Sequence, residues 1–481
     1  MSQRGDPLGR ILSRPPYLGD AIWVTLSERP YPRDPIRATP LSGRPKLLCQ
    51  APYDMIPRVT MNGTTRGHEF RMDIAIIGAG AAGLAAARRL TEHHNVTVFE
   101  SLPEIGGVWA CSQAATCQPI YDELRTNIPI DLMAFWDFPF RAQDKNSSTG
   151  DFPRADAVQA YLRRFAEHFD LLDLVKLETR VVTVEPLPLD RWQVRWEKNT
   201  PASGEAVFDA VVVCSGHYHR PVFPTRPAID HFSGRVMHAA NFTAGDDHRG
   251  ERVLVWGAHA SGTDLVRLIA PHAASVFWSG HADTMTAASA DLTNVHCHAD
   301  ITDYETSTFH FADGEEISQI DTLIYCTGYA YEFPFFSPDL LNCNGERIDD
   351  LYLDLIHAEL PTLAFIGIPS LIIPFPLFDA QSRWLSALWQ GTFTLADRSA
   401  RKAWVQARCQ AFQALDKPDR AFHRLGEAQM TYMRQLLAQA GEPSLPHEFE
   451  SATRAAQRHR LEYAGSFRDQ PIGRLSHRPP S

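Results

Sequence analysis

The segment MDIAIIGAGAAGLAAARRL, residues 72–90, carries the pattern that decides the fold. The apolar run Ile74 to Ile77 predicts a buried parallel strand, and the alanine-rich stretch after the glycines predicts a helix. In such a turn the first glycine allows a tight bend, the second lets a pyrophosphate approach the backbone, and the third lets the helix pack close to the strand. The N–H groups at the start of the helix favour phosphate binding. We therefore predict a dinucleotide-binding turn made of Gly78, Ala79, Gly80, Ala81, Ala82 and Gly83.

A second predicted strand, VTVFE, ends at Glu100. An acidic residue at this distance from the turn typically binds the ribose hydroxyls, and its charge repels a 2′-phosphate, so FAD or NAD fits the first site better than NADP. A pair of glycines follows in GGVW, residues 106–109. This pair resembles that of two-dinucleotide flavoproteins, which implies flavin contacts for Gly107, Val108 and Trp109.

A second glycine-rich turn, GAHASG at residues 257–262, follows the run FSGRVMHAANF at residues 232–242. One such turn is a weak signal, but two in one chain indicate a reaction that passes electrons between two cofactors. His259 replaces the middle glycine of the second turn, where a side chain can crowd a pyrophosphate. Two further predicted strands, in FDAVVVCSGH (208–217) and DTLIYCTGY (321–329), each end in a small-residue turn. The predicted fold class is therefore α/β, with two Rossmann-like dinucleotide-binding domains.

Composition limits the classes of function. The chain has 481 residues, of which 44% are hydrophobic and 21% charged, as in an ordinary globular protein with two or three domain cores. Its net charge of −11 and the lack of a basic run argue against a nucleic-acid partner. Eight cysteines without a CxxC pair favour a reducing compartment. No apolar stretch reaches the roughly 18 to 20 residues that span a bilayer, so we expect a cytoplasmic protein without a membrane anchor.

Residues 1–71 differ in composition from the rest of the chain. They are rich in proline and arginine and show no sustained periodicity. We interpret them as a disordered extension or as an overlong gene model, in which Met61 or Met72 is the true start.

The chain resembles the flavin-containing monooxygenases, a family of FAD- and NADPH-dependent enzymes. The family's motif F-x-G-x3-H-x3-(Y/F) is matched by Phe232, Gly234, His238 and Phe242. The resemblance covers about residues 72–465 in a consistent order. Its further matches are LRTNIP (124–129), DFPF (137–140), SGTD (261–264), CTGYAYEFPF (326–335), PFPLFDAQSRW (374–384) and the pattern formed by His423, Gly426, Gln429 and Tyr432.

The resemblance implies a discontinuous architecture, in which a smaller NADP-binding domain is inserted into a large FAD-binding domain. Prolines at 221, 224 and 227 punctuate the first boundary, as expected for a connection between domains. The expected limits are 72–225 for the first part of the FAD domain, 226–325 for the NADP domain, 326–465 for the second part of the FAD domain and 466–481 for a flexible tail.

The resemblance also implies a mechanism and its partners. NADPH reduces FAD by hydride transfer, and the reduced flavin reacts with O₂ to give a C4a-hydroperoxide, which bound NADP shields from water. A soft nucleophilic nitrogen or sulfur atom of a small molecule then takes the distal oxygen. The expected cofactors are therefore FAD and NADPH, and the expected partners are O₂ and a small-molecule substrate, with a homodimer left open. The flavin carries the chemistry, so neither a catalytic acid–base pair nor a metal is required.

Asn127 in LRTNIP matches the family's asparagine beside the flavin and is the expected catalytic residue. Its amide donates and accepts hydrogen bonds at once, which suits a group between flavin, nicotinamide and oxygen; the alternative is an asparagine that caps a loop. Thr126 and Gln381 match positions near the flavin, although Gln381 also fits a helix surface. We interpret His238 as a structural residue at a domain junction. The expected NADP contacts are Gly257, Ser261, Gly262, Thr263 and Asp264.

Two alternative functions stay open. A Baeyer–Villiger ketone monooxygenase has a similar pattern, but the motif of that class ends in tryptophan where this chain has Phe242. A non-oxygenating flavoprotein or an NADPH oxidase is the other alternative, and His259 is its only support. A metal site at NVHCHAD, residues 294–300, is not favoured, because no fourth ligand follows at a standard spacing.

The choice between NADPH and NADH is also open. An arginine that grips the 2′-phosphate often follows the strand after the second turn, but this chain has Gly280 and His281 there. A histidine adds charge only when protonated, so we expect a modest NADPH preference that grows as the pH falls through about 6.5. Arg249 or Arg252 is the alternative source of charge.

Overall fold

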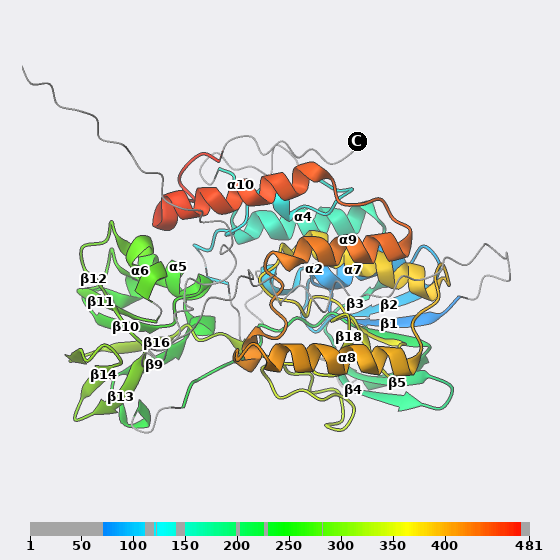
Figure 1. The fold of residues 1–481 in the computed structure, drawn as a ribbon, viewed down its shortest axis with the longest axis horizontal. Helices are drawn as coiled ribbons and strands as arrows, with labels where there is room; N and C mark the ends of the chain where they lie inside the picture. Colours follow the sequence, from blue (N-terminus) through cyan, green and yellow to red (C-terminus); the bar gives the residue numbers. More distant parts are fainter. Residues whose placement is uncertain are drawn as a thin grey trace, which may run out of the picture.

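The computed structural model describes residues 71–110, 120–121, 123–140, 150–198, 203–225, 229–280 and 282–472. Apart from its last residue, the extension expected over residues 1–71 lies outside the described residues. Figure 1 shows the described chain as two lobes, a large one around β1 (Asp73–Ile77) and a smaller one around β10 (Arg252–Trp256).

The large lobe is built on a seven-stranded sheet. The first three strands of the order given next pair antiparallel with one another, and all the other pairings of the sheet are parallel. The strands are, in spatial order, β18 (Leu351–Tyr352), β19 (Ile356–His357), β20 (Leu363–Phe365), β7 (Ala210–Val213), β1, β2 (Asn95–Phe99) and β3 (Val175–Lys176).

Helices cover one face of the large sheet, and a three-stranded antiparallel sheet covers the other (Figure 1). None of the described helices combines the length and apolar character needed to cross a membrane. The antiparallel sheet consists of β4 (Thr179–Leu187), β5 (Arg191–Lys198) and β6 (Ser203–Phe208). The helices of the large lobe are α2 (Ala81–Leu90), α3 (Ile130–Met133), α4 (Ala155–His168), α7 (Pro374–Trp389), α8 (Arg398–Gln413), α9 (Ala428–Ala440) and α10 (His447–Tyr463).

Alternate residues of β1 face two different cores. Ile74 and Ile76 are fully buried and belong to the core that the helices form. Ala75 and Ile77 belong to a second core, which includes Trp192 of β5. Because both faces of the strand are covered, its sequence is a continuous apolar run rather than an alternating one. The buried parallel strand predicted from this run is confirmed.

The smaller lobe is built on a five-stranded sheet in which every pairing is parallel. The α/β fold class with two Rossmann-like sheets is confirmed. The strands are, in spatial order, β12 (Val295–His298), β11 (Ser275–Ser279), β10, β16 (Thr322–Tyr325) and β9 (Arg235–His238). The lobe also contains α5 (Ala260–Ile269), α6 (Ala282–Ser289), β13 (Ile301–Glu305), β14 (Thr308–Phe311) and β15 (Glu316–Ser318).

Two connections join the lobes and lie side by side. The chain leaves the large sheet after β7 and returns to it with β18, and between them it builds the small sheet. β8 (Arg220–Pro221) in the outgoing connection pairs antiparallel with β17 (Tyr329–Ala330) in the returning one. The N–H of Val222 donates to the carbonyl of Gly328 at 3.0 Å, which extends this pairing. Such a topology is what an inserted domain requires, and the limits given above stay predictions.

Residues 467 and 468, near the end of the described chain, pack against the protein. Phe467 is 4% exposed, and its ring lies edge-on to Phe152 with centroids 5.3 Å apart. The next residue, Arg468, forms an ion pair with Asp264 of α5. This differs from the flexible tail expected from residue 466 onward, because an aromatic and a charged side chain find partners far away in the sequence. Residues 473–481 of that tail lie outside the described residues.

Candidate cofactor and active site

The first glycine-rich turn joins β1 to α2 and leaves no room for side chains at two positions. Gly78 has φ +104°, and a Cβ there would lie 2.5 Å from the carbonyl oxygen of Cys214. A Cβ on Gly83 would lie 1.9 Å from the carbonyl oxygen of Gly78. The tight bend and the close approach of the helix therefore both depend on glycine, as the sequence predicts.

Gly80 and the glycine pair of GGVW hold two loops together. The N–H of Gly106 donates to the carbonyl of Ala79 at 2.9 Å. A Cβ on Gly80 would lie 3.3 Å from the Cα of Gly107, and one on Gly107, which has φ +59°, would lie 2.9 Å from the Cα of Gly80. From the sequence we explained the glycine at position 80 only by the approach of a pyrophosphate. The structure adds a second reason, the backbone contact between Gly80 and Gly107. Two further predicted residues of the loop, Val108 and Trp109, are at least partly exposed.

The start of α2 is open to an anion. Its N-cap residue is Gly80, which has no side chain that could cap the helix, and the first turn has no acidic residue. The first N–H groups of the helix, those of Ala81, Ala82 and Gly83, have no intrahelical acceptor. A dinucleotide pyrophosphate fits these donors, since the helix dipole also favours negative charge at this end.

Glu100 lies directly after β2, beside the first turn. Its Oε2 accepts a hydrogen bond from the N–H of Ala79 at 2.7 Å, and its Oε1 accepts one from the N–H of Leu102 at 2.8 Å. Only 5% of the residue is exposed, and burial raises the pKa of the carboxyl group while these N–H donors oppose the rise. Glu100 thus fixes the shape of the turn, and its contact with a ribose stays a prediction.

The second turn repeats the geometry of the first. Gly257 has φ +122°, and a Cβ there would lie 2.3 Å from the carbonyl oxygen of Cys326. A Cβ on Gly262 would lie 1.8 Å from the carbonyl oxygen of Gly257. His259 is the N-cap residue of α5 and is exposed. Ser261 and Thr263 are partly buried in the first turns of the same helix.

Asp264 of α5 lies where the two lobes meet. Nη1 and Nη2 of Arg468 donate to its two carboxylate oxygens at 2.7 and 2.9 Å, and the hydroxyl of Tyr121 donates to it at 2.8 Å. Nε of Arg468 also donates to the carbonyl of Thr126 at 2.9 Å. One arginine therefore ties the helix of the second turn to the segment that carries Asn127. The sequence expected Asp264 to contact NADP, whereas the structure engages its carboxylate within the protein.

The segment 124–129 places Asn127 at a cavity. Thr126 is 3% exposed, and its hydroxyl donates to the carbonyl of Ile128 at 2.9 Å, which stabilises the loop. Asn127 is partly buried, and its amide has no hydrogen-bond partner among the described residues. Among the described residues the Asn127 side chain caps no loop, and α3 begins after Pro129 without a side-chain cap, which disfavours the alternative of a loop-capping asparagine.

The cavity beside Asn127 lies between this segment and α10. Three of its polar side chains, those of Asn127, Gln457 and Arg460, make no hydrogen bond or ion pair within the described part of the chain. Sequence reasoning missed Gln457 and Arg460, because they stand on a helix without a recognisable motif. The remaining walls of the cavity are Ile128, Pro129, Leu132, Ile373, Thr453 and Ala456.

Gln381 supports the backbone from inside α7. It is 0% exposed, so the alternative of a glutamine on the helix surface is wrong. Its Oε1 accepts a hydrogen bond from the N–H of Gly367 at 3.0 Å, and its Nε2 donates to the hydroxyl of Tyr432 at 2.9 Å. The Tyr432 hydroxyl donates in turn to the carbonyl of Leu353 at 2.7 Å. These internal bonds favour a supporting role for Gln381, and its contact with the flavin stays a prediction.

The motif around His238 makes structural contacts, in agreement with our interpretation of the sequence. Nδ1 of His238 accepts a hydrogen bond from the N–H of Ala240 at 3.1 Å, and Nε2 lies 3.1 Å from the carbonyl oxygen of Gly328. Burial lowers the pKa of His238 to about 4, so the ring is neutral at neutral pH and Nε2 donates. Phe242, at the end of the motif, packs edge-on against Tyr121 with centroids 5.5 Å apart. The motif therefore orders the junction between the lobes.

Arg249 and Arg252 lie at the wrong end of the small sheet to bind a phosphate at the second turn. Arg252 begins β10, and the turn follows the last residue of that strand, Trp256. A strand rises about 3.3 Å per residue, so the whole strand separates the two sites. Arg252 also donates to the carbonyls of Ser318 and Gln319. Neither arginine is a source of charge at the turn, which corrects that alternative; His281 lies outside the described residues.

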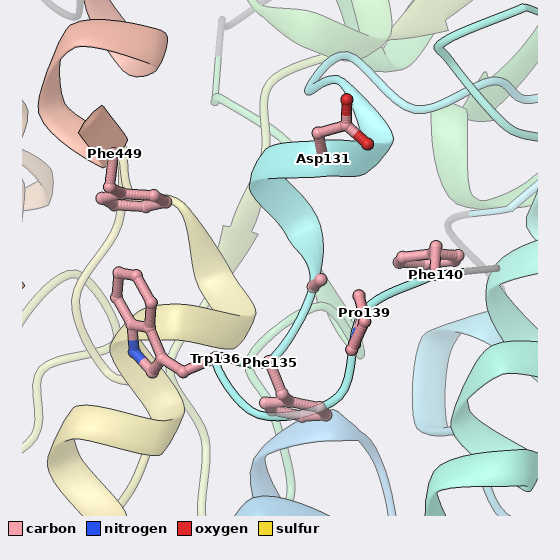
Figure 2. A pocket seen from close by; sticks show the side chains of 7 residues that line it. Asp131, Phe135, Trp136, Pro139, Phe140 and Phe449 are labelled. Atoms are coloured by element: carbon pink, nitrogen blue, oxygen red, sulfur yellow. The ribbon is translucent and has the colours of Figure 1, made fainter. Parts of the chain in front are cut away.

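A second cavity lies between the segment that follows α3 and the start of α10 (Figure 2). Aromatic rings dominate it, and the ring of Trp136 lies edge-on to that of Phe449 with centroids 4.7 Å apart. Asp131 is its charged residue. The cavity contains none of the predicted site residues, so it is not the site that the sequence indicates.

Within the described residues, no group of three or more His, Cys, Asp or Glu side chains is arranged to hold a metal ion. The His296 and His298 rings of β12 instead lie 5.3 and 6.1 Å from the ring of Phe277.

Comparison with known proteins connects this geometry to a family. A family model described as flavin-binding monooxygenase-like matches residues 71–290 and 287–447. The chain belongs to this family. Flavin-containing monooxygenase FMO GS-OX2 of Arabidopsis thaliana is 36% identical over 397 residues, which cover 78% of this chain and 86% of the relative. FMO GS-OX5 of the same plant is 35% identical over 399 residues, covering 77% and 85%. The protein is thus a flavin-dependent monooxygenase.

Solved structures agree with this assignment. The S-allyl-L-cysteine S-oxygenase from Allium sativum matches with a TM-score of 0.79 at 32% identity, covering 83% of this chain and 95% of that protein. Tmm from Pelagibacter sp. strain HTCC7211 shares the fold with a TM-score of 0.72 at 22% identity, covering 83% and 94%. A cyclohexanone monooxygenase shares it less closely, with a TM-score of 0.55 at 15% identity over 77% of this chain and 98% of that protein.

Proposed function

We propose that this flavin-dependent monooxygenase uses FAD and NADPH to transfer one oxygen atom of O₂ to a sulfur or nitrogen atom of a small molecule. The observation that carries the proposal is a pair of glycine turns with the same geometry. Arg468 ties the helix of the second turn to the segment of Asn127, whose amide has no hydrogen-bond partner among the described residues. Two such turns supply sites for an electron donor and an electron acceptor in one chain.

The first turn is the proposed FAD site. The open N–H groups at the start of α2 suit its pyrophosphate, and the backbone contact between the two glycine loops fixes the width of the site. When bound, the flavin supplies the two-electron chemistry and the activation of O₂. The proposed residues are Gly78, Ala79, Gly80, Ala81, Ala82, Gly83, Glu100, Gly107, Val108, Trp109, Thr126 and Asn127, with Gln381 acting through Gly367.

The second turn is the proposed NADPH site, with contacts from Gly257, Ser261, Gly262 and Thr263. Asp264 has a different proposed role, since its pairing with Arg468 orients α5 against the large lobe. The backbone of the second turn repeats that of the first although His259 replaces the middle glycine, which supports a nucleotide site here.

We assign Asn127 to the reacting centre. Its amide has no internal partner among the described residues and offers both a donor and an acceptor to a ligand. Arg468 and the buried Thr126 hold the backbone on one side of it, so the amide is presented from a fixed position. In this position Asn127 orients the reacting groups and helps to exclude water.

The relatives support sulfur as the preferred atom. The Allium sativum structure is named as an S-oxygenase that acts on S-allyl-L-cysteine, and it resembles this chain at 32% identity. The likeness to the cyclohexanone monooxygenase is one of fold alone, and Phe242 at the end of the motif argues against that class. We therefore propose thioether S-oxygenation as the main reaction and N-oxygenation as the second candidate.

The experiment is to purify the protein, record the spectrum of its flavin, and compare NADPH oxidation with product formation for thioethers, amines and ketones. We expect one non-covalent FAD per chain and a sulfoxide formed for most of the NADPH consumed. Oxidation of ketones alone would favour the Baeyer–Villiger alternative, and NADPH consumption without product would favour an oxidase. Homodimer formation and a cytoplasmic location stay predictions for separate experiments.

A further inference from the structure

We propose that Arg460 binds an anionic group of the substrate, so that the preferred substrate is a thioether that carries a carboxylate. This inference rests on the proposed function, because it places the anion in the cavity next to Asn127. Its basis is the convergence of the Asn127 amide, the Gln457 amide and the Arg460 guanidinium on one cavity, each without a hydrogen-bond partner among the described residues.

One face of α10 forms the polar wall of this cavity. Thr453, Gln457 and Arg460 are spaced by four and three residues, which places them on the same side of a helix. Thr453 already donates its hydroxyl to the carbonyl of Phe449 at 2.8 Å. Gln457 is 9% exposed, and its amide can donate to a bound anion beside the guanidinium. The helix therefore offers two donor groups and no acid to the cavity.

The charge of Arg460 is not neutralised within the described residues. Its guanidinium lies 5.3 Å from the centroid of the Phe467 ring, which holds the side chain in place without accepting a hydrogen bond. Asp264 is the acidic residue whose charge raises the pKa of Arg460, and it is already paired with Arg468. Burial and the charge of Arg468 lower the pKa of Arg460, against the opposing effect of Asp264. A partly buried cation of this kind is stabilised by an anion that enters the cavity.

The opposite wall of the cavity is apolar. Ile128, Pro129, Leu132 and Ile373 line it, and Asn127 stands next to them. The volume is about 30 Å³, and since one water molecule needs roughly 10 to 15 Å³ of such space, a small charged group fits better than a whole substrate. We therefore place the carboxylate at Arg460 and the sulfur atom toward Asn127.

A phosphate of a bound cofactor is the competing occupant. The turns proposed to hold phosphates lie before α2 and α5, and no residue of either turn lines this cavity. This separation favours an anion that enters independently of the cofactors, and the carboxylate of a substrate is such an anion.

The test compares Arg460→Gln with the wild type, both loaded with FAD, on three thioethers: methyl phenyl sulfide, (phenylthio)acetate and the methyl ester of (phenylthio)acetate. We expect the KM for the carboxylate to rise about 10- to 100-fold, because one charge-assisted contact is lost. The KM for the neutral sulfide, for the ester and for NADPH should stay within about twofold. Arg460→Lys should restore part of the loss, since it keeps the charge but not the planar donor pair.

Arg458→Gln is the matched control, because Arg458 is an exposed arginine on the same helix. If Arg460→Gln folds poorly, Gln457→Leu replaces it, with an expected rise of about 3- to 10-fold for the carboxylate alone. An equal effect on neutral and anionic substrates, no effect on any, or a raised KM for NADPH would overturn the proposal.

Calorimetry with 3-phenylpropionate, in which a methylene replaces the sulfur of (phenylthio)acetate, measures the anion site without turnover. Binding that is weakened in Arg460→Gln supports the site, and equal binding overturns it. If the wild type oxygenates no thioether at all, the proposed S-oxygenation fails, while this measurement still decides whether Arg460 holds a carboxylate.

Discussion

Gly107 touches Gly80 backbone to backbone: a Cβ on Gly107 would lie 2.9 Å from the Cα of Gly80. The contact joins the turn that begins α2 to the loop that follows β2, and the hydrogen bond between Gly106 and Ala79 strengthens it. A side chain at either position would push the two loops apart. Because both loops belong to the proposed FAD site, their spacing is open to a direct test.

Gly107→Ala should lose FAD. Gly150→Ala is a matched control, because Gly150 also has φ +59° but a Cβ added there would meet no atom within 4 Å. Both substitutions carry the backbone penalty of about 1–2 kcal/mol for a left-handed residue, and only Gly107→Ala adds the collision. The measurement is flavin absorbance per protein after gel filtration. Equal flavin content in the two variants would remove Gly107 from the site.

Asn127→Ala should keep FAD and lose coupling. The variant removes an amide that binds nothing else among the described residues, so the fold is left intact. We expect the yield of oxygenated product per NADPH to fall about 10- to 100-fold, the effect of one lost polar contact of roughly 1–3 kcal/mol. The NADPH that is consumed without forming product should give hydrogen peroxide instead. The exposed Asn95, replaced in the same way, is the control; normal coupling in Asn127→Ala would assign the residue a structural role.

Arg468→Gln should loosen the junction between the lobes. The variant breaks a two-bond pair with Asp264 whose partners are only 16% and 13% exposed, together with the bond to the Thr126 carbonyl. We expect a loss of about 1–3 kcal/mol in urea unfolding and faster proteolysis near the C-terminus. Arg195→Gln breaks the exposed pair with Glu185, 46% and 45% exposed, and should change stability by less than about 1 kcal/mol. Similar losses in the two variants would contradict a special role for Arg468.

Stability should fall as the pH is lowered from about 6.5 to about 4. Burial lowers the pKa of His238 to about 4, whereas the unfolded residue titrates near 6.5. Between these values the unfolded chain binds a proton that the folded protein does not, so acid favours unfolding. His238→Gln should flatten the dependence by up to about 1.4 kcal/mol per pH unit. The urea midpoint measured from pH 4 to pH 8 is the readout, with the exposed His93→Gln as control; an unchanged slope would refute the assignment.

Nicotinamide preference should not depend on Arg252. This residue lies at the opposite end of β10 from the second turn and is held by the carbonyls of Ser318 and Gln319. We expect Arg252→Gln to leave the ratio of kcat/KM for NADPH and NADH unchanged. In His281→Gln a modest NADPH preference should no longer grow as the pH falls through about 6.5. Steady-state kinetics with both nucleotides from pH 6 to pH 9 checks both statements.

The parts of the site that the sequence predicted are those set by the backbone. Gly78, Gly83, Gly257 and Gly262 each face a carbonyl oxygen at a distance that excludes any side chain, so the pattern of glycines carries the geometry directly. The same is true of the apolar run of β1, since both faces of that strand are covered. Local rules of this kind can be recognised from the sequence alone.

The parts that the sequence missed depend on side chains that meet from distant segments. The pairing of Asp264 with Arg468 and Tyr121, which lie 204 and 143 residues away, was not foreseen, whereas its contact with NADP stays a prediction. Arg460 stands on a helix whose sequence shows no motif, and only the fold brings it to Asn127. Gln381 was predicted to lie near the flavin, and its bonds to Gly367 and Tyr432 inside the core of the large lobe were not foreseen. No local periodicity encodes such long-range pairs.

The discontinuous large sheet sets an order of events during synthesis on the ribosome. β7 pairs with β1 on one side and with β20 on the other, and about 150 residues of chain separate β7 from β20. The whole small lobe is made in this interval, so a nascent chain exposes one unpaired edge of β7 until residue 365 emerges. An open edge of this kind is prone to pair with other chains. The pair between Arg468 and Asp264, which ties α5 to the segment of Asn127, forms later still, because residue 468 follows the whole of the large sheet in the chain.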